Sequence, residues 1–144
     1  MEYFEDITVG DSDRFGTYEV TRDEMTTFAR RYDPQPIHTD ADAAEASMFG
    51  GLVASGWHTA AITMRLLAVH KLTDSGAMGA MGVDSLRWPA PVRPGDTLSV
   101  ETEVVATELF DDGRGRVDVE VTTTTATDDV VLSMVPSVLW RRRG

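Results

Sequence analysis

The spacing of hydrophobic residues changes part-way along the chain, and this change constrains the fold more than any other feature. Between residues 56 and 72 apolar side chains recur at helical intervals, without a proline or an internal glycine. From residue 78 onward apolar and polar side chains alternate instead, most clearly over 117–121. A helix-forming half followed by long strands with one polar face predicts an α+β protein built on an antiparallel sheet.

Three helices are predicted in the first half of the chain. Thr21–Glu24 has the form of a capping box, so a short helix begins there and ends near Tyr32. A second helix is expected over 41–48, with Asp40 as its N-cap. The longest helix runs over 56–72 and is expected to be largely buried. Its predicted buried face carries Trp57, Ala60, Ala61, Met64, Leu67 and Ala68.

Strands are predicted over 98–105, 117–121 and 130–140. Residues 93–96, Arg-Pro-Gly-Asp, favour a type II turn, and residues 111–115 favour a hairpin loop. One sheet that curls around the central helix satisfies this order with few crossing connections. At 144 residues the chain fits a single domain, 1–144, with one core and one functional site.

The composition excludes several classes of function. No cysteine is present, which removes disulfide scaffolds, thiolate zinc sites and cysteine nucleophiles. A net charge of −11 argues against nucleic acid or anionic membranes as partners, because both are negatively charged. Lys71 is the only lysine, and the abundant acidic residues suit a halophile-like protein kept soluble in concentrated salt. The N-terminus lacks the features of a secretion signal and no apolar run could span a bilayer, so a cytoplasmic location is expected.

The densest group of chemically useful side chains lies in residues 32–40, Tyr-Asp-Pro-Gln-Pro-Ile-His-Thr-Asp. The two prolines predict an extended, rigid connection from Asp33 to Ile37. His38 could take a proton from water while the Asp33 carboxylate aligns that water or returns a proton to carbon, with the Gln35 amide orienting one of them. Alternatively, Asp33 caps the preceding helix and His38 is an inert histidine. The residues alone leave both interpretations open.

A run of small residues over 51–56 leads directly into the long helix. Free backbone N–H groups at a helix N-terminus stabilise developing negative charge, and Gly56 lets a ligand approach the main chain. An enolate-like oxygen on a thioester carbonyl is such a charge. A glycine is also acceptable as an ordinary N-cap, so Gly56 alone does not decide the function.

Three segments together resemble the MaoC-like dehydratase family, which includes the (R)-specific enoyl-CoA hydratases. They are Tyr-Asp-x-x-Pro-Ile-His-x-Asp over 32–40, Gly-Leu-Val-Ala-Ser-Gly over 51–56 and Pro-Val-Arg-Pro-Gly-Asp-Thr-Leu over 91–98. The resemblance covers nearly the whole chain in the right order. It implies a hot-dog fold, in which a strongly bent antiparallel sheet wraps around the long helix. It also implies a homodimer, or a dimer of dimers, with active sites at the subunit interface.

The same resemblance implies a hydro-lyase. In the family, water adds reversibly to a trans-2-enoyl thioester to give the (R)-3-hydroxyacyl thioester, without a metal ion or redox cofactor. Coenzyme A takes part only as a portion of the acyl-CoA substrate. Asp33 and His38 match the catalytic pair, and the Gly56 N–H matches the donor to the thioester carbonyl.

Five further residues are expected to contact the substrate: Gln35, Ser55, Trp57, Met64 and Arg87. Many relatives have asparagine at the position of Gln35 and histidine at that of Ser55, which implies a different acyl preference here. Met64 is a candidate for lining an acyl tunnel, although an apolar residue at helical spacing is core by default.

Arginines are the candidates for binding the phosphates of coenzyme A. Arg87 and Arg93 are two of them, and residues 141–143 a third, although a solvated, frayed tail is the preferred interpretation of 141–143. His58 and His70 are expected to be structural. No metal site is predicted, because the three histidines lack a matched ligand spacing.

Two other functions stay open at this stage. One is a thioesterase, because a fold does not by itself fix the chemistry. The other is a non-catalytic acyl-binding subunit of a larger hydratase. The sequence does not determine the length of the acyl group, the choice between coenzyme A and acyl carrier protein, or the pathway.

Overall fold

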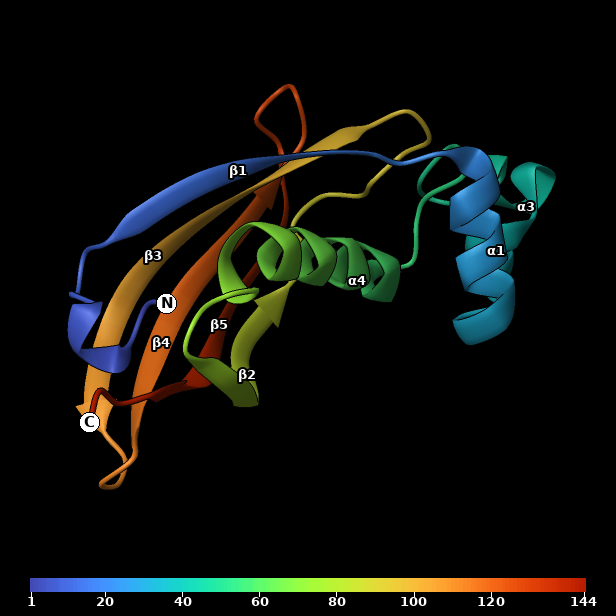
Figure 1. The fold of residues 1–144 in the computed structure, drawn as a ribbon. Helices are drawn as coiled ribbons and strands as arrows, with labels where there is room; N and C mark the ends of the chain where they lie inside the picture. The colour runs from blue at the N-terminus through green and yellow to red at the C-terminus, as the bar shows by residue number, and fades with distance from the viewer.

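A five-stranded antiparallel sheet curls around one central helix, α4 (Gly56–Leu67), in the computed structural model, which describes residues 1–144 (Figure 1). The strands are β1 (Ser12–Glu19), β2 (Ala77–Arg87), β3 (Thr97–Leu109), β4 (Arg114–Thr124) and β5 (Val130–Arg141). They lie in the order β1-β3-β4-β5-β2, and every neighbouring pair is antiparallel. The α+β class and the bent sheet around a central helix are therefore confirmed.

The face of the sheet that points toward α4 carries the hydrophobic core. Along β3 and β4 buried residues alternate with more exposed ones, so Val100, Val104 and Val119 share one face. These valines belong to the same cluster as Ile62 and Leu66 of α4. A fully buried Val or Leu side chain contributes roughly 1.5–3 kcal/mol, so this shared face determines which side of the sheet the helix covers.

Both predicted turns are confirmed. Gly95 has a φ of +90°, and the Asp96 N–H donates to the Arg93 carbonyl at 3.1 Å, as in a type II turn. The loop between β3 and β4 is held by the Asp111 carboxylate, which accepts the Gly113 N–H at 3.0 Å. The loop over 111–115 joins the neighbouring strands β3 and β4 directly, whereas the segment that contains the turn over 93–96 crosses from β2 at one edge of the sheet to β3 near the other edge.

Three short helices connect β1 to α4 and gather at one end of the sheet (Figure 1). They are α1 (Arg22–Tyr32), α2 (Pro36–Thr39) and α3 (Ala41–Glu45). Thr21 Oγ1 accepts the Glu24 N–H at 3.2 Å, and the Asp40 carboxylate accepts two N–H groups of α3, so both predicted N-caps are confirmed. Helix α3 ends at Glu45, earlier than the predicted Met48.

The extended connection predicted from Asp33 to Ile37 is wrong beyond Gln35. Pro36 begins the single-turn helix α2 instead of preventing it. At the first helical position the missing N–H of proline costs nothing, because that group has no partner inside the helix, and the fixed φ suits a helix start. The turn places His38 on its buried side.

The predicted buried face of the long helix is mostly wrong, since Leu67 is the only residue of the predicted set that is buried. Trp57 and Met64 are 58% and 47% exposed, and the buried residues are His58, Thr59, Ile62, Thr63, Leu66 and Leu67. Thr63 faces the sheet because its hydroxyl forms a hydrogen bond of 2.7 Å with Thr123 of β4. Hydrophobicity alone could not reveal this pairing. The last turn, η2 (Ala68–Leu72), is a π-helix.

The basic C-terminal residues are not a frayed tail. Arg142 contacts the Glu5 carboxylate at 3.3 Å, and Arg143 contacts Asp6 at 2.8 Å and covers the ring of Tyr3. All three partners lie in or beside η1 (Phe4–Asp6), so the two ends of the chain are held together. None of the helices has the length and hydrophobicity that crossing a bilayer would require.

Candidate active site

Asp33 ends helix α1 and is oriented by two side-chain donors. The Gln35 amide donates to Oδ1 at 2.7 Å, and the Ser55 hydroxyl donates to Oδ2 at 2.7 Å. Burial would by itself raise the pKa of the Asp33 carboxyl. The hydrogen bonds from Gln35 and Ser55 and the proximity of His38 outweigh that effect, so the pKa of Asp33 lies below its ordinary value. Asp33 is therefore an ionised carboxylate near neutral pH.

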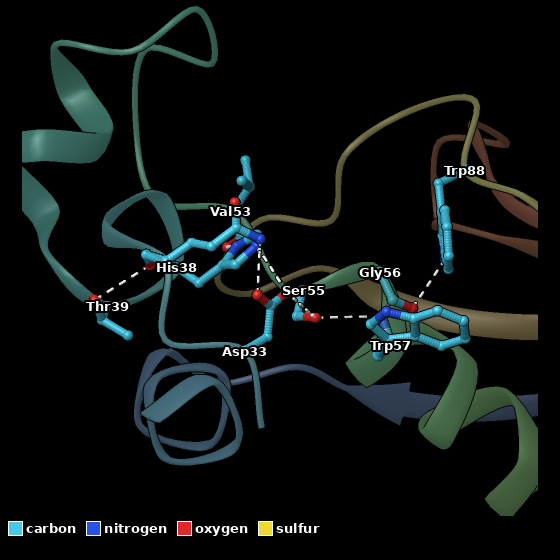
Figure 2. Close-up of polar contacts among 9 residues, drawn as sticks. Asp33, His38, Thr39, Val53, Ser55, Gly56, Trp57 and Trp88 are labelled. Carbon is cyan, nitrogen blue, oxygen red and sulfur yellow. Dashed lines mark hydrogen bonds and ion pairs between the residues drawn. The ribbon is translucent and has the colours of Figure 1, made fainter. Parts of the chain in front are cut away.

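His38 is buried and faces this carboxylate (Figure 2). Its Nδ1 lies 2.8 Å from the Val53 carbonyl oxygen, and its Nε2 lies 3.3 Å from Asp33 Oδ2. A carbonyl oxygen can only accept, so Nδ1 carries the hydrogen and Nε2 is the proton acceptor of the neutral ring. Two acceptors this close need a proton or a water molecule to bridge them, so the pair is suited to holding and passing one proton.

The start of helix α4 provides a backbone donor beside this pair. Ser55 is the N-cap, and its hydroxyl oxygen accepts the Trp57 N–H at 3.3 Å while donating to Asp33. The Gly56 N–H, at the first helical position, has no hydrogen-bond partner within the chain. Because the N-terminus of a helix carries partial positive charge, this group favours a negatively charged oxygen.

These groups border one cavity of about 600 Å³. Asp33, Gln35 and His38 form its polar wall, and Gly56 lines it as well. The remaining lining is mostly apolar and consists of Met48, Phe49, Val53, Ala54, Trp57, Thr59, Trp88, Pro89, Ala90, Pro91, Val92 and Val131. A few convergent polar groups in an apolar cavity are typical of a site for a small organic ligand.

A family profile described as the MaoC like domain matches residues 7–128, most of the chain. The chain belongs to the MaoC-like dehydratase family. It is 36% identical to the 3-hydroxyacyl-thioester dehydratase Z of Mycobacterium tuberculosis over 109 residues, which are 73% of this chain and 70% of that protein. It is 30% identical to the (R)-specific enoyl-CoA hydratase of Rhodospirillum rubrum, over 72% of this chain and 70% of that protein.

Solved structures agree with this membership. The crystal structure of the MaoC-like dehydratase from Rhodospirillum rubrum has a TM-score of 0.91 and 41% identity, and covers 99% of this chain and 98% of that one. The hot-dog fold implied by the sequence motifs is thus confirmed, and hydratase or dehydratase chemistry is the coarse function that the relatives support.

Most of the site residues predicted for this MaoC-like chain do come together. Asp33, His38, Gly56, Gln35 and Trp57 all line the cavity. Their roles in catalysis and binding stay predictions.

Three of the residues predicted to contact the substrate do not line this cavity. Ser55 is fully buried beneath the cavity and acts on Asp33 instead. Met64 lies on the exposed face of α4, outside the cavity, because the buried face of that helix is offset. Arg87 also lies outside it, at the end of β2 opposite Ser133 of β5.

Sequence reasoning on this MaoC-like chain missed the aromatic and proline-rich wall. Trp88 lies directly over Gly56, and Phe49 follows α3 at the opposite rim. The segment 88–91, Trp-Pro-Ala-Pro, could have indicated this wall, since an aromatic residue beside two prolines is held rigidly. Arg93, one candidate for binding phosphates, donates to the Phe49 carbonyl at 2.7 Å and so supports that rim.

Proposed function

We propose that the chain catalyses the reversible hydration of a trans-2-enoyl-CoA to the (R)-3-hydroxyacyl-CoA. The observation that carries this proposal is the 3.3 Å approach of Asp33 to His38 on the wall of an apolar cavity that also includes the start of α4. The names of the related dehydratase and hydratase support the same reaction class. Addition of water changes no net oxidation state, so the proposed reaction uses no redox cofactor, and its proton transfers need no metal ion.

The Asp33–His38 pair supplies the proton transfers. In the hydration direction a water O–H bond breaks, its proton passes to His38 Nε2, and the water oxygen bonds to C3 of the enoyl group. The electron pair of the C2=C3 double bond moves toward the thioester carbonyl oxygen. A proton then returns from the pair to C2, so the pair regains its starting state and only the elements of water have been added.

The start of α4 stabilises the charge that develops on the thioester oxygen. The unpartnered Gly56 N–H and the partial positive charge of the helix N-terminus both favour an enolate-like oxygen at this place. One pre-oriented donor of this kind contributes about a hundred- to a thousandfold to the rate. A substrate that fills the apolar cavity displaces water from it, which strengthens that interaction.

The direct test is the loss of the conjugated enoyl-thioester absorbance when crotonyl-CoA is added. We expect activity in the wild type, and a loss of at least about a hundredfold in Asp33→Asn and in His38→Ala. A thiol-reactive dye in parallel samples distinguishes a thioesterase, which releases free coenzyme A, from a hydratase, which does not. Equal absorbance loss in all three proteins, or thiol release without hydration, would remove the proposal.

We also propose that the active protein is a homodimer. Strand β2 is at an edge of the sheet and exposes Met78, Met81 and Val83, each about half exposed. Exposed apolar side chains on an unpaired edge favour pairing with a second copy of the same strand. Light scattering coupled to size-exclusion chromatography is expected to give twice the 15.8 kDa chain mass, and a monomeric active species would contradict it.

A further inference from the structure

The indole of Trp88 occupies the space beside Gly56 in which a side chain would lie. A Cβ atom on residue 56 would be 2.5 Å from Trp88 Cε2 and 2.8 Å from its Cδ2 and Nε1, closer than real Cβ contacts. Trp88 Nε1–H also donates to the Gly56 carbonyl oxygen at 2.8 Å (Figure 2). Residue 56 therefore has to be glycine to accommodate Trp88, before any ligand is considered.

The chain around Trp88 holds the indole in this place. Strand β2 ends at Arg87, and Trp88 is followed by Pro89 and Pro91. A residue before proline is restricted to extended backbone, so Trp88 has little freedom to move away. The Trp88 ring also meets Trp57 edge-on, with ring centroids 5.2 Å apart. The pre-proline backbone and the contact with Trp57 thus act together with the hydrogen bond to Gly56 to hold the indole.

We infer that Trp88 is a positioning residue for the hydration reaction, because it fixes the Gly56 backbone and thereby the amide that receives the thioester oxygen. The inference rests on the proposed function, since it assigns a role within that reaction. Glycine has more backbone freedom than any other residue, and a donor is effective only if it is oriented before the charge develops. Trp88 limits that freedom because its indole fills the space beside residue 56 and donates a hydrogen bond to the Gly56 carbonyl.

A positioning role differs measurably from that of a passive wall. Trp88 is 40% exposed and lines the cavity, so it could simply contact the substrate. Such contact would bind the substrate and the transition state alike, and its loss would raise KM. If Trp88 positions the Gly56 donor, loss of the indole misaligns that donor. The misalignment destabilises mainly the transition state and therefore lowers kcat.

The first test replaces the indole with a ring that lacks the N–H. In Trp88→Phe we expect kcat to fall about three- to tenfold, the effect of one lost hydrogen bond, with KM within about twofold of the wild type. Trp140→Phe is the matched control, because Trp140 Nε1 has no hydrogen-bond partner and is remote from the cavity. An unchanged kcat in Trp88→Phe, or a rise in KM alone, would overturn the inference.

The second test measures the coupling between residues 56 and 88. Gly56→Ala alone is expected to lower kcat/KM by at least about a hundredfold, because the new methyl group displaces the indole and the amide together. In a Trp88→Ala background the same change is expected to cost less than about tenfold. Equal losses in both backgrounds would overturn the inference, since position 56 would then be small for the substrate alone.

Folding and function are separated by two further readings. Circular dichroism melting shows whether each variant is folded, and Trp88→Phe keeps the test valid if either alanine variant unfolds, since it retains an aromatic ring. Hydration by the wild type without coupling between residues 56 and 88 defeats only this inference. A wild type that does not hydrate crotonyl-CoA defeats the proposed function and the inference with it.

Discussion

Two buried histidines of this chain pair with carboxylates, and their surroundings differ. His38 lies 3.3 Å from Asp33, and His58 lies 3.0 Å from Glu24. The two residues are 6% and 3% exposed, so burial does not distinguish them. The Asp33–His38 pair borders the cavity of about 600 Å³ beside Gly56, whereas His58 borders a smaller pocket of about 320 Å³ and is stacked against Phe28 with ring centroids 4.7 Å apart.

This difference is the reason for assigning the proposed reaction to the Asp33–His38 pair and a structural role to the His58–Glu24 pair. Glu24 also accepts the Tyr18 hydroxyl at 2.5 Å, and this hydrogen bond raises the pKa of Tyr18. Through these contacts Glu24 joins β1, α1 and α4, which is a structural role. The Asp33–His38 pair instead lies beside the unpartnered Gly56 N–H and an apolar cavity, where substrate and water can meet.

Replacing each histidine with alanine should give the largest difference in kcat between the two pairs. We expect His38→Ala to lower kcat for crotonyl-CoA hydration by about a hundred- to ten-thousandfold, because the proton acceptor is lost. His58→Ala is expected to lower it less than about tenfold in protein that remains folded. The two kcat values are compared from steady-state rates measured well below the melting temperature of each variant. Similar losses in the two variants would erase the distinction.

His58→Ala should cause the larger loss of stability, although His38→Ala causes the larger loss of activity. We expect His58→Ala to lower the free energy of unfolding by about 2–4 kcal/mol, since it leaves a cavity beside Phe28 and removes a partner of Glu24. His38→Ala should cost about 1–2 kcal/mol, because water from the cavity can replace its hydrogen bonds. Urea unfolding followed by circular dichroism gives both values. A larger loss for His38→Ala contradicts the structural role of His58.

The donors that support Asp33 should be visible in the pH dependence. Ser55→Ala removes one hydrogen bond that lowers the pKa of Asp33, so the pKa rises and the acidic limb of the kcat/KM profile moves to higher pH. At acidic pH we expect a loss of about tenfold relative to the wild type, with most of the activity recovered at neutral pH.

Ser137→Ala is the matched control for that experiment. The Ser137 hydroxyl donates to the Asp118 carboxylate at 2.7 Å on the sheet, away from the cavity, so the kcat/KM profile of Ser137→Ala should match that of the wild type.

The low pKa of Asp33 should also make the stability of the fold depend on pH. The depressed pKa of Asp33 stabilises the fold above the ordinary aspartate pKa, and this contribution is lost as pH falls through the native pKa. In Ser55→Ala the contribution should be smaller.

The smallest expected effect concerns α1, which links the two pairs by carrying Glu24 in its first turn and Asp33 at its end. Thr21→Ala removes the N-cap of this helix and should lower stability by about 1 kcal/mol. Because neither carboxylate loses a direct partner, kcat should change less than about twofold. A large fall in kcat with unchanged stability would show that the cap acts on the site itself.

Local signals in the sequence predicted the elements that local chemistry determines. The caps at Thr21 and Asp40 and the turn over 93–96 follow from side-chain and backbone preferences of a few adjacent residues. Asp33 and His38 could also be predicted to lie close together, because only four residues, two of them prolines, separate them in the chain.

Contacts between distant segments could not be predicted in the same way. Thr63 turns toward the sheet because of Thr123, and Trp88 covers Gly56, although each pair is far apart in the sequence. Glu24 fits the spacing of a capping box, yet its carboxylate binds Tyr18 and His58. In each case tertiary contacts outweighed a local preference, and the partner could be recognised only once the chain had folded.

The central claim is that the Asp33–His38 pair adds water across a thioester-conjugated double bond. Its most direct test is nuclear magnetic resonance of the product formed from crotonyl-CoA in heavy water. The account predicts (R)-3-hydroxybutyryl-CoA with one deuterium at C2 in a single configuration from the wild type, and none from Asp33→Asn in the same time. The same deuterated product at equal rates from both proteins, or free coenzyme A with the double bond intact, would contradict it.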